Sequence, residues 1–368
     1  MVNLQREISR NLLVEVAYVG NRGVWFEAVG LNDINALTPE RLRTFGFDIN
    51  SAADRAVLIA PLNSAAARAD ARVKIPYTGY PQGASVAQSL RPYPQFGTLA
   101  ADLSPLGNTW YDSLQAKVTK RFSKGLDFTV AYTFSKNLAT VVEQGGATIR
   151  VNDVFNRAAL KALSPNDQPH VFVTNFRYEV PMFGFMNRNG LTRALLAGWE
   201  VSGIFRYASG EPIPVPAAQN NLAQLLFRGS FANRVSGVPL FTKDLNCGCI
   251  DAKRDFVLNP AAWSDPAPGT FGQSAPFFGD YRFARVYDES MSFGKLTRFR
   301  EKMSFEFRVE FFNIFNRVRL NGPDNGNALA TQQRNATTGE TISGFGRINF
   351  SGTASAVRSG QVALRLRF

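Results

Sequence analysis

The strongest constraint in this sequence is an alternation of apolar and polar side chains in residues 109–136. A period of two predicts β-strands, and the turn Ser123-Lys124-Gly125 predicts that two strands fold back as an antiparallel hairpin. The apolar face has Trp110, Tyr132 and Phe134 at one end and Phe122 at the other. Aromatic rings at two levels are typical of the wall of a transmembrane β-barrel.

The same alternation recurs along the chain, as in Phe305, Phe307, Val309 and Phe311. With the hairpin, it predicts about nine strands. Besides the hairpin, the expected strands are residues 2–8, 12–20, 172–180, 199–207, 287–293, 305–311 and 362–368. The predicted fold class is all-β, an antiparallel transmembrane barrel wall. Bacterial barrels have even strand counts, so this wall is expected to be incomplete.

Short and long connections alternate between the predicted strands. The long ones cover about residues 21–108, 137–168, 211–282 and 316–358. In outer-membrane barrels the short turns are periplasmic and the long loops extracellular, so we expect the long connections and the C-terminus on opposite sides of the membrane. The expected outer-rim aromatics are Trp110, Phe134, Phe205 and Tyr207, and the inner-rim ones are Phe122, Tyr178, Trp199 and Phe368.

Composition excludes several other classes. Hydrophobic residues make up 45% of the chain, but no run of about eighteen apolar residues could form a helical span. The net charge of +12 comes without a nucleic-acid-binding motif, so lipid head groups or anionic solutes are the expected partners, and nucleic acid is not. We find no catalytic constellation and no cofactor motif, and predict no enzymatic activity. A soluble all-β domain is an alternative, and it would stay in solution without detergent.

Cys247 and Cys249 are the only cysteines, and His170 is the only histidine. Two thiols alone do not complete a metal site, so we expect no bound metal. A loop disulfide in an oxidising exterior and two unpaired thiols both remain open. His170 lies at a strand start and is expected to have no chemical role. Thr38-Pro39-Glu40 predicts a helix start inside the first long connection.

The polar face of the predicted wall carries charged side chains that could line a solute path. They could equally form cross-strand ladders that rigidify the wall. These lumen-facing candidates are Lys117, Arg121, Arg177, Glu179, Glu200, Arg206, Glu306, Arg308 and Glu310.

The two ends of the chain carry signals of their own. The chain opens with Met1 and a charged, strand-like stretch rather than a signal peptide, so we expect a fragment or a gene start assigned too late. It closes on Phe368, with Leu366, Leu364 and Val362 stepping back by two. This ending is similar to the signal by which the barrel-assembly machinery takes up outer-membrane strands.

Several segments together resemble the C-terminal barrel of Oar-like TonB-dependent receptors, over essentially the whole chain. The matching motifs are structural ones: QSLRPYPQF at 88–96, WYDSLQAK at 110–117, KRFSKG at 120–125, AYTFSK at 131–136, Gly198-Trp199, SGEP at 209–212, FRVEFFNIFN at 307–316 and RLRF at 365–368. The resemblance implies that residues 1–368 are the C-terminal portion of a 22-stranded outer-membrane barrel with an N-terminal plug.

The resemblance also implies a function. Such receptors bind and import bulky solutes with energy passed by TonB, through a box ahead of the plug. The sequence contains neither plug nor box, so TonB is expected to act only through a plug outside this chain. A surface adhesion or interaction protein, in which the long loops bind a partner and nothing crosses, is the alternative.

Overall fold

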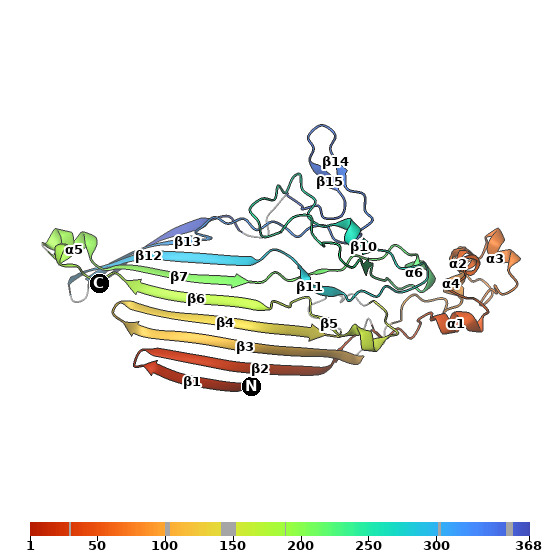
Figure 1. Cartoon of the computed structure of the whole chain (residues 1–368), viewed down its shortest axis with the longest axis horizontal. Coiled ribbons are helices and arrows are strands. Elements are labelled where there is room, and N and C mark those ends of the chain that lie inside the picture. Colours follow the sequence, from red (N-terminus) through yellow and green to blue (C-terminus); the bar gives the residue numbers. More distant parts are fainter. Residues whose placement is uncertain (29–30, 100–103, 141–151, 188, 301–302, 351–355) are drawn as a thin grey trace.

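The computed structural model describes residues 1–28, 31–99, 104–140, 152–187, 189–300, 303–350 and 356–368. Nine long strands form one antiparallel sheet in the order β1-β2-β3-β4-β6-β7-β12-β13-β16, and a short strand, β5, pairs with β4 (Figure 1). The long strands are β1 Val2–Ser9, β2 Leu12–Glu27, β3 Pro105–Ser123, β4 Leu126–Ala139, β6 His170–Glu179, β7 Trp199–Ala208, β12 Val286–Arg300, β13 Met303–Phe312 and β16 Ser359–Arg367.

Short elements lie in the connections. The strands among them are β5 Ala162–Leu163, β8 Pro212–Pro214, β9 Asn233–Arg234, β10 Trp263–Ser264, β11 Phe277–Arg282, β14 Gln333–Arg334 and β15 Thr341–Ser343. The helices are α1 Pro39–Thr44, α2 Ala52–Ile59, α3 Ala65–Ala69, α4 Val86–Ser89, α5 Gly190–Leu196 and α6 Leu222–Leu225, with 3₁₀ turns η2 Arg157–Leu160, η3 Gly184–Asn187 and η4 Pro260–Ala262.

The predicted hairpin is confirmed as β3 and β4. Its turn has φ of 52° at Lys124 and 78° at Gly125, the two positive values that match the twist of paired strands. A side chain at Gly125 would also meet the carbonyl of Glu179 at 2.6 Å, so the tight pairing with β6 requires glycine here. The hairpin register then places Leu114 opposite Phe134 and Val118 opposite Val130.

The register keeps one apolar row of side chains in phase across the sheet. Val14 faces Val118, Val118 faces Val130, and at the far edge Phe305 faces Leu366. Leu114 is 52% exposed and Leu364 66% exposed, and no residue of the nine strands whose burial is described is a buried member of the three hydrophobic cores. The sheet is therefore not the covered core of a water-surrounded domain. Apolar side chains of this face, such as Leu114 and Leu364, are not covered by the three cores.

The strands extend further than the alternation predicted. β2 was expected to end near Gly20 but runs to Glu27, and β3 begins at Pro105 rather than Thr109. A short connection was expected between the predicted strands at 287–293 and 305–311, yet β12 continues as far as Arg300. Backbone hydrogen bonds do not require side chains to alternate, so strand pairing continues where the apolar–polar alternation stops. In the extension of β2 the register shifts at a bulge between Gly23 and Phe26.

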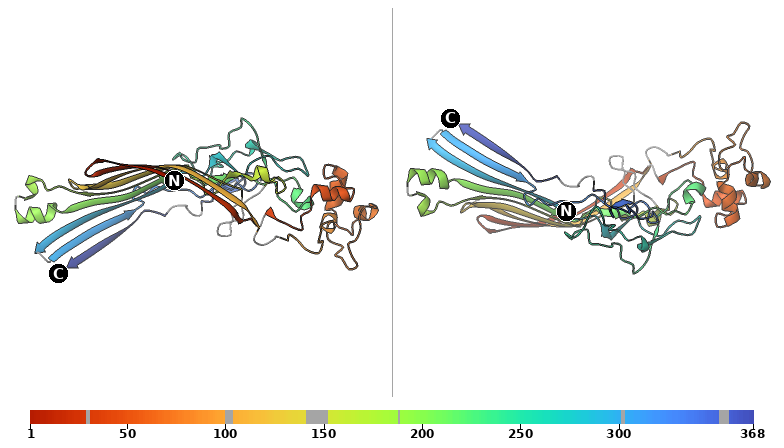
Figure 2. Two further views of the ribbon diagram at one scale, coloured as in Figure 1. Left: turned by 90° about the horizontal axis from the view of Figure 1, so that it is seen from below. Right: turned by 90° about the horizontal axis from the view of Figure 1, so that it is seen from above.

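The long and short connections lie at opposite ends of the sheet. In Figure 1 the turn at residues 10–11, the turn at 124–125 and the α5 connection are at one end, and the α1–α4 region is at the other. The connection between β12 and β13 falls at residues 301–302, outside the described residues. Figure 2 shows that β12, β13 and β16 turn away from the preceding strands, so the sheet is strongly curved.

The long connections fold together into one cap with cores of its own. In the first core Leu42 and Leu58, from the first long connection, pack with Leu222 and Leu225 of α6. In the second, Val257 packs with residues such as Phe345 from the last long connection. The predicted helix start is confirmed, because the Thr38 hydroxyl caps α1 by accepting a hydrogen bond from the Arg41 backbone N–H at 3.1 Å.

A charge placed in the outward apolar row tests this arrangement. Val130→Arg should lower the free energy of unfolding in a phospholipid bilayer by about 2–4 kcal/mol, because the guanidinium would be forced among acyl chains. Thr129→Arg is the matched control, since Thr129 belongs to the polar face and lies opposite Thr119 and Asn175. Urea titrations of the bilayer-folded protein compare the two, and equal losses would contradict the assignment of faces.

Candidate functional site: the loop cap and the polar face

The nine charged residues proposed as lumen-facing candidates all project from one face of the sheet. The register puts Lys117 opposite Glu15 and Ala131, Glu179 opposite Glu200, and Arg308 opposite Ala363. These positions alternate with the apolar row on every strand. The residues gathered on this face, called the polar face below, include Lys117, Arg121, Arg177, Glu179, Glu200, Arg206, Glu306, Arg308 and Glu310.

Most of these side chains pair across strands. Lys117 Nζ lies 3.0 Å from Glu15, and Arg121 lies 3.5 Å from Glu7. Arg177 Nε donates to Glu200 at 2.8 Å. Such ladders between facing strands stabilise the sheet, so the wall-rigidifying interpretation fits these residues.

Other members of the set pair within one strand or with a neighbouring connection. Arg308 lies between two carboxylates, 3.5 Å from Glu306 and 3.4 Å from Glu310. Arg206 donates instead to the side-chain oxygen of Gln168 at 3.1 Å, which ties β7 to the connection before β6. Arg177 also bonds Glu179 on its own strand.

The curvature of the sheet turns part of the polar face into a hollow. A cavity of about 840 Å³ lies beside the α5 connection and is lined largely by residues of β6, β7, β12, β13 and β16. Its cations are Arg177, Arg193, Lys295, Arg298, Arg308 and Arg367, and its carboxylates are Glu179, Glu200 and Glu306. The excess of cations favours anionic groups in the hollow.

A buried charge cluster locks the cap together. Asp33 and Arg91, from the first long connection, are each 3% exposed and lie 3.3 Å apart. Arg228, from the third long connection, donates to the same Asp33 oxygen at 2.9 Å. The other Asp33 oxygen accepts the backbone N–H of Leu99 at 2.9 Å. This carboxylate therefore holds two cap segments that lie far apart in the sequence.

Two smaller hollows lie between different long connections. One, of about 380 Å³, is lined by residues from three of them, including Asn32, Phe155, Arg157 and Arg228. The other, of about 270 Å³, lies between the third and fourth, beside Glu211, Phe283 and Arg319. Both combine apolar walls with charged groups, as solute pockets do.

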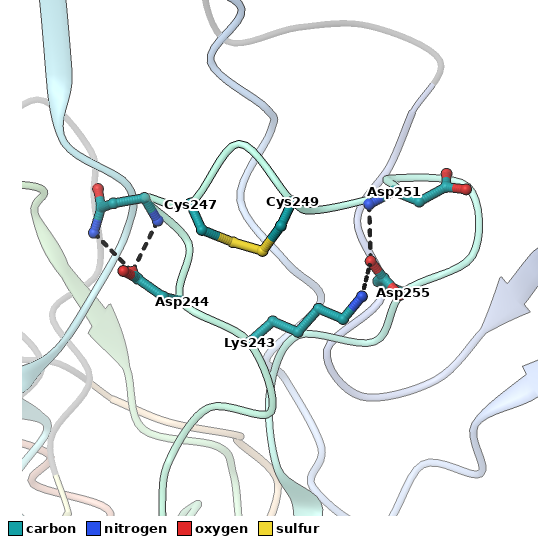
Figure 3. The surroundings of a disulfide bond; sticks show 7 residues. Lys243, Asp244, Cys247, Cys249, Asp251 and Asp255 are labelled. Carbon is teal, nitrogen blue, oxygen red and sulfur yellow. Dashed lines mark hydrogen bonds and ion pairs between the residues drawn. A yellow bond between two sulfur atoms is a disulfide. The ribbon is translucent and has the colours of Figure 1, made fainter.

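The two cysteines form a disulfide in the third long connection. Cys247 and Cys249, two residues apart in the sequence, are joined by this bond (Figure 3). Just before the bridge, Asn246 donates its backbone N–H to the Asp244 carboxylate at 2.9 Å. On the other side Lys243 Nζ donates to Asp255 at 2.7 Å. Burial alone would raise the pKa of Asp255, but the hydrogen bonds from Lys243 and the Asp251 N–H lower it below its ordinary value. The bridge thus closes a tightly hydrogen-bonded surface loop.

The C-terminal residues and the histidine lie at the borders of the sheet. Val362, Leu364 and Leu366 are in the apolar row of β16, an edge strand in the described sheet, and Phe368 follows them, 93% exposed. His170 begins β6, and its Nδ1 shares a hydrogen bond of 2.8 Å with the Tyr132 hydroxyl. These contacts put His170 among the aromatic rings at the cap end of the apolar row.

Sequence reasoning overlooked one buried carboxylate in the apolar row. Glu289 is 1% exposed, accepts a hydrogen bond from the Tyr207 hydroxyl at 2.8 Å and lies 3.1 Å from Arg317 Nε. The chain after β13 folds back over it, with the Ile314 N–H bonded to the Glu289 carbonyl at 2.9 Å. The sequence contained a signal for this site, because a carboxylate at an apolar position of a predicted membrane strand needs a hydrogen-bonding or charged partner.

Within the ranges that the structure describes, no three His, Cys, Asp or Glu side chains are grouped as a metal site would require. In the same ranges, no helix combines the length and apolar character of a membrane span.

The Asp33 cluster generates a first test. Asp33→Asn leaves Arg91 buried without its counter-charge, and loss of one partner of a buried pair costs about 3–5 kcal/mol. Trypsin cleavage within the cap should therefore become about 100-fold faster or more, because cleavage follows the population of the open form. Glu40→Gln, at an exposed carboxylate of the same connection, should leave the rate unchanged. Similar rates for both variants would show that Asp33 does not hold the cap closed.

Arg72 generates a second test, on pH. Hydrogen bonds from Arg72 lower the pKa values of Asp54 and Asp70. Groups with lowered pKa values stabilise the fold above their unfolded pKa, near about 4, and that contribution is lost as the pH falls through the folded values. Amide exchange in α2, corrected for intrinsic rates, should thus accelerate below about pH 4.

Two variants check the cause of this acid response. Arg72→Met should speed exchange at neutral pH and remove the extra acceleration in acid. Arg43→Met should change neither, because its ion pair with Glu40 is solvent-exposed. An unchanged acid response in Arg72→Met would exclude Arg72 as its source.

Comparison with known proteins agrees with the geometry described above. The model of a family described as outer membrane beta barrel domain matches residues 1–361. No curated protein and no solved structure matches the chain. Because the match spans nearly the whole sequence, the chain belongs to the outer membrane β-barrel domain family, and it is a protein of the bacterial outer membrane.

Proposed function

We propose that the chain is the C-terminal wall of an Oar-like TonB-dependent receptor, and that its long connections capture a bulky solute outside the cell. The observation that carries this proposal is the one-sided cap, built from long connections over a sheet whose polar face is hollowed. A receptor needs a stable outer surface for capture and a polar interior for passage. The motifs of the resemblance, including the FRVEFFNIFN segment at 307–316, support the same family.

The sheet also indicates what completes the barrel. Each strand of the path runs antiparallel to its neighbours, so β1 and β16, at the two edges, run in the same direction. A closed antiparallel barrel has an even number of strands and no free edge in lipid. We propose that an odd number of strands from outside residues 1–368 lies between β16 and β1, as in a 22-stranded barrel.

In this proposal the polar-face ladders line the lumen and contact a plug. The long connections face outward, and the short turns face the periplasm. The partners are outer-membrane lipids, the barrel-assembly machinery, the unknown solute, and TonB acting through a plug outside this chain. The proposal includes no enzymatic step and no cofactor.

The second candidate is an adhesion or interaction protein. Several large apolar side chains of the first long connection are exposed, among them Tyr77 at 46%, Tyr93 at 49% and Phe96 at 49%. Exposed aromatic side chains suit a protein partner, and such a surface would act without passage through the wall.

Uptake and attachment can be separated in the bacterium that carries the gene. Cells with the intact gene, with Asp33→Asn, or with Glu40→Gln as control are grown in the same medium, and the solutes that each strain depletes are measured by mass spectrometry. We expect at least one solute to be depleted only by the intact and control strains, and depletion to stop with a protonophore. Unchanged depletion together with weaker attachment of Asp33→Asn cells to surfaces would contradict transport and favour adhesion.

A further inference from the structure

The α5 connection, residues 180–198 between β6 and β7, exposes an unusual number of apolar side chains. Leu191 is 71% exposed and Leu195 59% exposed, and helix α5 has no buried residue. Ahead of the helix, Phe183 and Phe185 stack with their ring centroids 6.0 Å apart and remain about half exposed. These side chains contribute to none of the three hydrophobic cores. A contiguous apolar surface of this kind is unfavourable in contact with water alone.

Two side chains of the apolar row hold the end of α5. Trp199, the first residue of β7, donates its indole N–H to the Leu195 carbonyl at 3.1 Å. Lys295 lies opposite Trp199 on β12, donates to the Ala197 carbonyl at 2.6 Å, and has its ammonium 5.1 Å from the indole centroid. The exposed leucines are therefore fixed next to the rim of the face that meets lipid.

The two sides of α5 differ. Gly190, Arg193, Ala194 and Ala197 line the polar-face hollow, whereas Leu191 and Leu195 are not among its lining residues. Residues four apart share one side of a helix, so the two leucines project together, away from the small residues. The helix thus lies across the edge of the wall, with one side toward the hollow and the other toward the surroundings of the barrel.

The charges near α5 indicate which kind of surface covers the leucines. Residues 180–199 contain Arg188 and Arg193 but no Asp or Glu. Cations beside exposed apolar side chains are typical of elements that lie in the interface of an anionic membrane, and a Trp at the same level is typical of the interfacial belt.

We propose that residues 182–187 and 189–196 form an interfacial anchor that inserts Leu191, Leu195 and the Phe183–Phe185 pair into the phospholipid leaflet at the short-turn end of the barrel. Arg193 and Lys295 then lie at the level of the lipid phosphates. The anchor continues the apolar row past the end of the strands, and the assignment of the leaflet rests on the proposed orientation. The occupant is phospholipid, rather than a periplasmic protein.

Nitroxide labels at single cysteines test the anchor in the full chain. Leu191→Cys, Leu195→Cys, Ala194→Cys and Val130→Cys are made in a Cys247→Ser/Cys249→Ser background, together with the strands proposed to lie outside residues 1–368. The closed barrel is then folded into vesicles of phosphatidylethanolamine and phosphatidylglycerol. Collisions with oxygen, which concentrates among acyl chains, are compared with collisions with a water-soluble nickel chelate. The oxygen-to-nickel ratio at positions 191 and 195 should be at least about threefold that at 194 and should approach the value at 130.

Each of the other possible results would overturn a specific part of the proposal. A high ratio at 130 with low, equal ratios at 191, 194 and 195 would exclude the anchor and leave the barrel wall intact. If the labels at 191 and 195 become immobilised only when periplasmic extract is added, the partner of the leucines is a protein and the lipid anchor is contradicted. A low ratio at 130 as well would show that the wall itself is not in the bilayer, and both proposals would fail.

Discussion

Pairing of backbone N–H and C=O groups is the constraint on which this structure depends. In a bilayer no water satisfies those groups, so a chain without long apolar helices can cross only as hydrogen-bonded strands. The nine-stranded ladder meets this demand between its edges, and the two-residue period then sorts side chains onto two faces. Because the register is in phase from β1 to β16, a lipid-facing wall and a polar face follow from the same set of hydrogen bonds.

The cap depends on a different kind of interaction. Its segments are held by hydrophobic cores and by buried charge pairs such as Asp33 with Arg228, which link two connections separated by the strands β3, β4, β6 and β7. Such contacts fix the shape of the cap without altering the wall. The wall can thus present loops of defined shape, while the ladders of the polar face keep the wall itself unchanged.

Much of the wall was predictable from the sequence because lipid imposes a period that few other environments impose. The strands and the apolar row from Leu114 to Leu364 follow from that period, and the turn at Lys124-Gly125 follows from its glycine. The extensions of β2 and β12 were not predictable, since beyond the alternating part only backbone pairing defines a strand. The cap core was also not predictable, because the contacts of α6 with α2 join residues far apart in sequence and carry no local pattern. Glu289, a carboxylate at an apolar position of β12, was a sequence signal for a buried polar contact that was overlooked.

The central claim is that the apolar row touches acyl chains, and photolabelling along β13 tests it most directly. A lipid with a photoreactive group in its acyl chain is mixed into the bilayer, and the labelled positions are identified by mass spectrometry. The account predicts adducts at Phe305, Phe307 and Val309 and none at Glu306, Arg308 and Glu310. Adducts without this alternation, or adducts on the charged positions, would contradict it.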